Sequence, residues 1–187
     1  MRITGGRAKG ISLTVPRGST VRPATDRMRE AVFSSLGERV VGARFIDLFA
    51  GTGAYGLEAI SRGAAGGVFI ERDRHAIQAL RRNLAAVGKS LGNPGEVMRI
   101  ATRDALSWRP TDSERASLVF ADPPYGVPDD FLVELGRFLP GIVEVASDPV
   151  AIVETPGQRA LKVSGWHCFK TLGKGRGQPV CQFWRPD

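Results

Sequence analysis

The sequence predicts an α/β protein built on a mostly parallel sheet with an antiparallel C-terminal edge. Between residues 45 and 153, short apolar runs of strand length alternate with segments of helical periodicity. Such alternation is typical of a parallel sheet covered by helices on both faces. The last two predicted strands, 167–172 and 180–184, flank a Gly-rich turn with no helix between them, which indicates antiparallel pairing.

The N-terminal region is expected to form a β-hairpin within residues 1–16, followed by a helix. Thr25 or Asp26 is a good N-cap for this helix, and Gly37 supplies its stop. Downstream strands are expected over 45–50, 67–70, 97–101, 118–121 and 150–153, which with the two C-terminal runs make seven. Helices are expected over 54–61, 73–87 and 129–138, the second ended by Gly88.

The composition is that of an ordinary globular chain. With 187 residues, 42% hydrophobic and 24% charged, it is long enough for one domain with a small appendage. No run approaches the ~20 apolar residues of a membrane helix, and no apolar segment typical of a signal peptide opens the chain. The two cysteines, Cys168 and Cys181, are expected to be core thiols in a reducing cytoplasm, without a metal.

The net charge of +7 is concentrated at the two chain ends. The first 29 residues hold seven Lys and Arg against one Asp, and residues 159–187 hold six against one Asp. The segment between them is net acidic. Concentrated positive charge suits a polyanion, since phosphate contacts release counterions. The charge pattern therefore favours nucleic acid as a partner, although a solvated basic surface gives the same pattern.

A glycine-rich turn follows the first apolar strand. The residues Gly51-Thr52-Gly53-Ala54-Tyr55-Gly56 match the G-x-G-x-x-G dinucleotide fingerprint, and Glu71 lies where its ribose-binding acid is expected. Glycine lets a backbone approach a ligand closely, and a helix N-terminus favours an anionic group. This motif alone fits an NAD enzyme as well as a methyltransferase.

Three features favour the methyltransferase and its cofactor, S-adenosylmethionine. Asp47 lies inside the strand before the glycines, where it can help hold the methionine ammonium. Asp104 follows the third strand, where an acid can accept the adenine amino group. The third feature is Asp122-Pro123-Pro124-Tyr125 after the fourth strand. All three lie at expected strand ends, where ligands bind in doubly wound sheets.

The Asp122–Tyr125 tetrapeptide suits an exocyclic amine. Two prolines remove two N–H donors, which leaves the carbonyl groups of Asp122 and Pro123 free to accept. The Asp122 carboxylate and the Pro123 carbonyl can receive both hydrogens of an amino group and direct its lone pair at a methyl group. Tyr125 can stack on an extruded base, at ~1–3 kcal/mol per base.

The order of these motifs resembles the RsmD family, which are bacterial 16S ribosomal RNA guanine-N2 methyltransferases of the Rossmann-like class I fold. The resemblance is carried by Arg22-Pro23-Ala24-Thr25-Asp26-Arg27-Met28-Arg29-Glu30, by Asp47-Leu48-Phe49-Ala50-Gly51-Thr52-Gly53 and by Asp122-Pro123-Pro124-Tyr125. The opening Arg2-Ile3-Thr4-Gly5-Gly6 and the segment from Gly56 to Gly63 are also similar. Ala24 departs from the Thr more usual in the family.

The resemblance implies a set of site residues. Asp122, Pro123, Pro124 and Tyr125 would be catalytic, and Asp47, Phe49, Ala50, Gly51, Thr52, Gly53, Glu71, Arg72, Asp104 and Ala105 would bind the cofactor, Glu71 at the ribose and Asp104 at the adenine. Arg7, Lys9, Arg22, Thr25, Asp26 and Arg27 would face RNA. Residues 1–37 would then form a basic, RNA-facing extension and residues 38–187 the methyltransferase domain.

The implied substrate is a specific guanine of the guanine-966 type, in small-subunit RNA of an assembling ribosomal particle. Three alternatives remain: an adenine-N6 DNA or RNA methyltransferase, an NAD-dependent oxidoreductase and a non-catalytic RNA-binding module. The adenine-N6 methyltransferase keeps the chemistry of the Asp122–Tyr125 tetrapeptide. The oxidoreductase gives no role to that tetrapeptide or to the basic chain ends. A cytoplasmic monomer without metal or membrane contact is expected.

Overall fold

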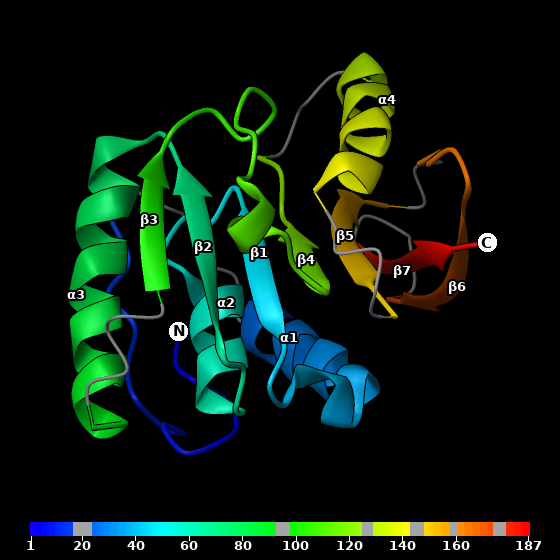
Figure 1. The fold of residues 1–187 in the computed structure, drawn as a ribbon. Coiled ribbons are helices and arrows are strands. Elements are labelled where there is room, and N and C mark those ends of the chain that lie inside the picture. Colours follow the sequence, from blue (N-terminus) through cyan, green and yellow to red (C-terminus); the bar gives the residue numbers. More distant parts are fainter. Residues whose placement is uncertain (17–23, 93–97, 125–128, 143–147, 158–160, 174–178) are drawn as a thin grey trace.

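The structure, a computed structural model, describes residues 1–16, 24–92, 98–124, 129–142, 148–157, 161–173 and 179–187. Seven strands form one sheet in the order β3-β2-β1-β4-β5-β7-β6 (Figure 1). They are β1 (Arg44–Leu48), β2 (Gly66–Glu71), β3 (Met98–Thr102), β4 (Leu118–Ala121), β5 (Val150–Pro156), β6 (Trp166–Leu172) and β7 (Pro179–Pro186). The first five are parallel, and β7 runs antiparallel to both β5 and β6. The predicted fold class is confirmed.

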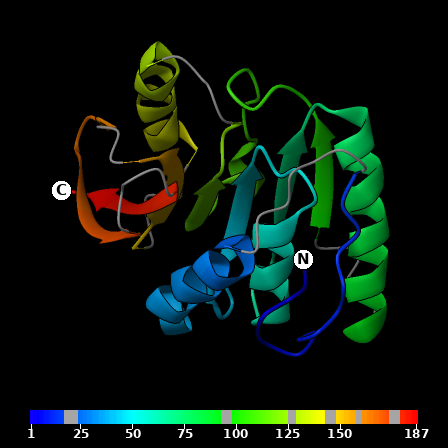
Figure 2. The same cartoon turned by 180° about the vertical axis from the view of Figure 1, so that it is seen from behind.

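Helices cover both faces of the sheet. On one face lie α1 (Ala24–Leu36), α2 (Ala54–Ser61) and α3 (Arg74–Ser90), whose apolar side chains pack with Phe45, Phe69 and Phe120. Figure 2 shows α1 and α2 in front of the strands. On the other face, α4 (Asp129–Phe138) packs with the alternate strand residues, such as Ile46 and Val119. None of the helices among the described residues is both long and apolar enough to cross a membrane.

Several element boundaries differ from the prediction. Helix α1 begins at Ala24, so Thr25 and Asp26 lie in its first turn and are not its N-cap. Helix α3 continues through Gly88 to Ser90, because glycine permits a helix stop without imposing one. Strand β1 ends at Leu48, since Phe49 takes a left-handed φ of 57° that turns the chain out of the sheet.

The first sixteen residues form a narrow hairpin that packs against the helices. Arg2 and Ser12 make an antiparallel bridge, and Ile3 N donates to Ile11 O at 2.9 Å. The side chains of Ile3, Ala8 and Leu13 are buried in the same core as those of α1 and α2. The hairpin therefore shares the hydrophobic core of the sheet domain.

A buried ion-pair network, the Glu58 cluster, joins the hairpin to α1 and α2. The Glu58 carboxylate is fully buried and receives Arg29 Nε at 3.3 Å and Arg62 Nε at 2.8 Å. Both its oxygens also accept from Thr4, from the backbone N–H and from the hydroxyl, each at 2.8 Å. Arg29 in turn contacts Asp26 at 2.9 Å and donates to the carbonyl of Arg2. Part of the Arg22–Glu30 motif is thus used to fasten α1 to its neighbours.

Candidate functional site

Three acidic side chains meet at the carboxyl ends of neighbouring strands. Asp47 lies in β1, Asp122 directly follows β4 and Glu154 lies in β5. Asp47 is paired in register with Phe120, which is paired with Ile152, so residues two positions later, Asp122 and Glu154, share its side of the sheet. This acidic cluster faces α2, whose Gly56 N–H donates to Asp47 Oδ2 at 2.9 Å.

The surroundings of the acidic cluster disfavour ionisation of its carboxyl groups. Burial raises the pKa of Asp47 to about 8, an effect that the Gly56 hydrogen bond partly opposes and Glu71 adds to. Burial, then Glu154 and Asp47, raise the pKa of Asp122 well above its ordinary value. Among the described residues no Lys, Arg or His forms an ion pair with any of the three. A cationic ligand beside these carboxyl groups would favour their ionised forms.

Sequence reasoning missed Glu154 and its two partners. The Tyr55 hydroxyl donates to Glu154 Oε2 at 3.1 Å, and Cys181 Sγ donates to the same oxygen at 3.8 Å. Glu154 is a charged residue directly after a buried apolar run, and this signal could have identified it. Tyr55 and Cys181 give no such signal, because they reach Glu154 only once α2, β5 and β7 are assembled.

The glycine turn leaves one side open at the strand ends. Gly51 and Gly53 have left-handed φ values of 54° and 79°. A Cβ on Gly53 would lie 2.3 Å from Leu80 Cδ1, and one on Gly56 would lie 2.3 Å from Phe69 Cε1, so both allow close helix packing. A Cβ on Gly51 would meet nothing closer than 3.9 Å. Gly51 is therefore the position where a ligand can approach the backbone.

Glu71 fixes this turn from the end of β2. Its Oε2 accepts from Gly51 N at 2.8 Å, and its Oε1 accepts from the backbone N–H groups of Arg72 and Asp73, each at 2.8 Å. The other predicted turn residues lie beside it. Ala50 N donates to Ile70 O at 3.0 Å, Thr52 O accepts from Asn83 at 2.9 Å, and the Phe49 ring contacts that of Phe131 on the opposite face.

The predicted adenine side is formed by the residues after β3. Asp104 Oδ2 pairs with the exposed Arg72 at 2.6 Å, and Asp104 Oδ1 accepts from Leu106 N at 3.1 Å. Ala105 is buried beside them. Asp104 and Arg72 thus contact each other at the neighbouring strand ends, and their role toward a ligand stays a prediction.

The diproline corner lies within this site. Pro123 is buried and Pro124 exposed, and both follow Asp122 at the end of β4, the strand next to β1. The glycine turn follows β1, so the corner and the turn leave neighbouring strands at the same edge. Tyr125 lies outside the described residues.

The comparisons with known proteins agree with the motifs. The family described as Conserved hypothetical protein 95 matches residues 1–185. Ribosomal RNA small subunit methyltransferase D of Escherichia coli K12 is 42% identical over 125 residues, which cover 67% of this chain and 60% of that protein. The chain belongs to the RsmD family.

Two further relatives fit this RsmD-family assignment. Ribosomal RNA small subunit methyltransferase D of Haemophilus influenzae is 33% identical over 125 residues, covering 67% of this chain and 64% of that protein. The solved structure of yhhF from Escherichia coli superposes with a TM-score of 0.79 at 33% identity, covering 100% of this chain and 98% of that one. The chain thus aligns with nearly the whole of the yhhF structure, whereas its sequence match spans about 60% of the Escherichia coli methyltransferase D.

The predicted RNA-binding residues of this RsmD-family chain come from the hairpin and from the segment that leads into α1. Arg7 and Lys9 are exposed in the hairpin, and Arg27 is exposed on α1. Asp26 is held by Arg29 in the Glu58 cluster. Thr25 lies in the first turn of α1, where its side chain is not described, and Arg22 lies outside the described residues. Their contact with RNA stays a prediction.

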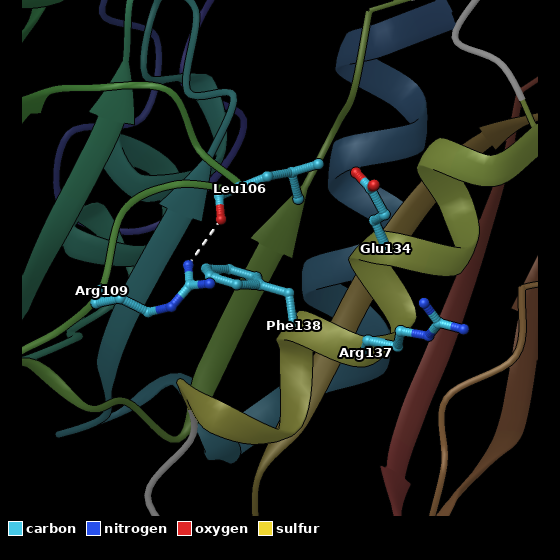
Figure 3. A pocket seen from close by; sticks show the side chains of 5 residues that line it. All are labelled: Leu106, Arg109, Glu134, Arg137 and Phe138. Carbon is cyan, nitrogen blue, oxygen red and sulfur yellow. Dashed lines mark hydrogen bonds between the residues drawn. The ribbon is translucent and has the colours of Figure 1, made fainter.

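A hollow of about 260 Å³ lies between the residues after β3 and helix α4, lined by Leu106, Arg109, Glu134, Arg137 and Phe138 (Figure 3). The Arg109 guanidinium lies over the Phe138 ring, 5.0 Å from its centroid, and donates to the Leu106 carbonyl at 2.7 Å. Leu106 and Phe138 belong to the core on the α4 side of the sheet. The hollow is therefore on the face opposite the acidic cluster.

Proposed function

We propose that this chain transfers a methyl group from S-adenosylmethionine to the exocyclic N2 of a guanine in small-subunit ribosomal RNA. The observation that carries the proposal is the acidic cluster, in which Asp122 opens a diproline corner beside the glycine turn. The names of the relatives and the family membership support RNA methylation.

The site suits this cofactor in two ways. The ammonium and sulfonium groups of S-adenosylmethionine are cationic, and none of the described basic residues forms an ion pair with the acids of the acidic cluster. The open side of Gly51 allows a ligand to approach the backbone, and Asp47 is placed to hold an ammonium group. When bound, S-adenosylmethionine supplies a methyl group on a positively charged sulfur, which is attacked by a nitrogen lone pair.

The residues of this chain position the amine. The Asp122 carboxylate and the Pro123 carbonyl accept its two N–H groups, which orients the nitrogen lone pair toward the cofactor. Positioning of this kind can supply most of the rate enhancement without a strong base. The cofactor's charge favours the ionised form of Asp122, which can also accept the proton that leaves the nitrogen.

The choice of guanine over adenine, and of the guanine-966 type, is part of the proposal and is supported by the family resemblance. The proposal also includes an assembling small-subunit particle as the substrate and an enzyme that acts as a cytoplasmic monomer. The two cysteines are both free, as a reducing compartment would leave them. Cys181 is buried as expected, but Cys168 is exposed on β6, so the expectation that both are core thiols is wrong for Cys168.

The Asp122→Ala variant tests the proposal. It should bind S-adenosylmethionine within about threefold of wild type and lose at least 100-fold in methyl transfer, as an interaction made to the reacting group does. Cofactor binding is measured by calorimetry, with NAD as the competing ligand of the oxidoreductase alternative. Transfer is measured by mass analysis of nucleosides from small-subunit particles incubated with the enzyme.

Asp130→Ala is the matched control, because Asp130 is an exposed acid on α4. It should leave both measurements unchanged. Full activity in Asp122→Ala, or binding of NAD in place of S-adenosylmethionine, would contradict the proposed function.

A further inference from the structure

Glu154 is a buried carboxylate at the proposed target pocket that the methyl-transfer scheme leaves without a role. It follows Val153, which is paired in register with Ala121, and Asp122 follows Ala121. The two acids therefore take adjacent positions on neighbouring parallel strands, with their side chains on the same side of the sheet. The Glu154 side chain is 7% exposed, and its charge contributes to the raised pKa of Asp122.

One oxygen of Glu154 is occupied and held in place. The Tyr55 hydroxyl and Cys181 Sγ both donate to Oε2, at 3.1 and 3.8 Å. The Tyr55 ring is itself fixed by stacking on Phe120, with centroids 5.4 Å apart and ring planes at 18°. None of the described residues donates a hydrogen bond to Oε1. The carboxylate is thus oriented by one oxygen, with the other available as an acceptor.

We infer that Glu154 is a specificity-determining residue that accepts the N1–H of the target guanine while Asp122 and Pro123 accept its amine. The inference rests on the proposed function. Guanine presents three N–H donors in a row on this edge, two on the amine and one on N1. Asp122 and Pro123 receive two, and the adjacent acid is placed for the third.

The same geometry would reject a purine without the N1 hydrogen. Adenine and 2-aminopurine carry a lone pair at N1, which would face the Glu154 oxygen and leave it without a donor. A site built to hydrogen-bond a substrate N–H typically rejects an analogue that lacks it by ~10⁴–10⁵-fold. Base discrimination would then come from Glu154, and amine activation from Asp122.

The test uses ribosomal RNA that carries either guanine or 2-aminopurine at the position wild-type enzyme methylates, reconstituted into small-subunit particles. Both bases keep the 2-amino group, and only guanine has the N1 hydrogen. Wild-type enzyme should prefer guanine by at least about 100-fold in kcat/KM. Glu154→Gln should reduce that ratio at least tenfold, because its amide can donate to the N1 lone pair of 2-aminopurine.

Glu134→Gln makes the same chemical change on an exposed α4 residue and should keep the wild-type ratio. Thermal unfolding and calorimetry with S-adenosylmethionine establish that Glu154→Gln folds and binds cofactor. A wild-type ratio in folded Glu154→Gln would overturn the inference and leave the proposed function standing. If wild-type enzyme forms no N2-methylguanine, the proposed function fails and the inference fails with it.

Discussion

The buried carboxyl groups of the acidic cluster lower the stability of the free protein when they ionise. Asp47 is 2% exposed and receives only one hydrogen bond from the described residues, from Gly56. A carboxylate so placed is destabilised by the loss of water, which is why its pKa rises to about 8. The loss of water around Asp47 would also strengthen the attraction between its carboxylate and a bound cation.

This pKa predicts how stability depends on pH. Because the pKa of Asp47 is higher in the folded state than in the unfolded state, the folded protein binds more protons between about pH 4 and pH 8. The free energy of unfolding without cofactor should therefore fall as pH rises, by about 1–2 kcal/mol from pH 6 to pH 8 for this group. Urea denaturation at the two pH values measures it.

Asp47→Asn is the companion variant for this measurement. It should have a shallower pH dependence, be more stable than wild type at pH 8 and bind S-adenosylmethionine more weakly. Identical pH dependence in wild type and Asp47→Asn would mean that Asp47 is ionised in the free protein.

At the scale of elements, the turn from β1 into α2 combines tight packing with one open side. Gly53 fits against Leu80 and Leu57, whereas Gly51 has free space on the side where a Cβ would be. The two glycines share a left-handed φ but differ in what an added methyl group would touch. Gly53 is therefore needed for helix packing, whereas Gly51 leaves space that the proposed cofactor would use.

The matched pair Gly51→Ala and Gly53→Ala tests this division. Each should cost about 1–2 kcal/mol for the left-handed backbone, and Gly53→Ala should cost about 1–3 kcal/mol more for overpacking. Gly51→Ala should weaken cofactor binding more than its stability loss explains. Chemical denaturation and calorimetry give the two quantities, and equal binding by Gly51→Ala and wild type would place the cofactor elsewhere.

The Glu58 cluster joins three elements, the hairpin, α1 and α2, through buried charged groups. Glu58→Ala would remove one of the two carboxylates that pair with buried Arg29, and breaking a buried pair costs about 3–5 kcal/mol. Glu38→Ala, an exposed acid after α1, should change stability by less than about 0.5 kcal/mol. A small effect of Glu58→Ala on the urea midpoint would show that the hairpin is fastened by its apolar residues alone.

For the whole molecule, the basic N-terminal region is carried by a hairpin and a helix that are packed into the core of the sheet domain. Exposed Arg7, Lys9 and Arg27 lie on this rigid support. A charged surface on a rigid support can position RNA as well as attract it.

Replacing Lys9 and Arg27 together by alanine should weaken RNA binding and reduce the slope of log affinity against log salt by about 1 for each lost phosphate contact. Arg115→Ala is the control, since this exposed arginine precedes β4, the central strand of the sheet, and belongs to neither the hairpin nor α1. Filter binding of small-subunit RNA over a salt series measures both. An unchanged slope in the double variant would put the RNA on another face.

The sequence by itself determined the order of strands and helices along the chain. It also determined that the glycine turn, Asp47 and Asp122 lie at strand ends. These features are local, since burial leaves a periodicity of two or a continuous apolar run that can be seen within a few residues. The antiparallel edge was also predictable, because no helix separates its last two strands.

Only the tertiary structure decided which polar groups meet. Tyr55, Glu154 and Cys181 come from α2, β5 and β7, and Arg29 of α1 meets Glu58 of α2 because the two helices pack together. Even the end of α3, two residues past Gly88, differs from the local glycine signal. Contacts between residues on different elements leave no periodicity in the chain, so their partners are fixed only when the layers pack.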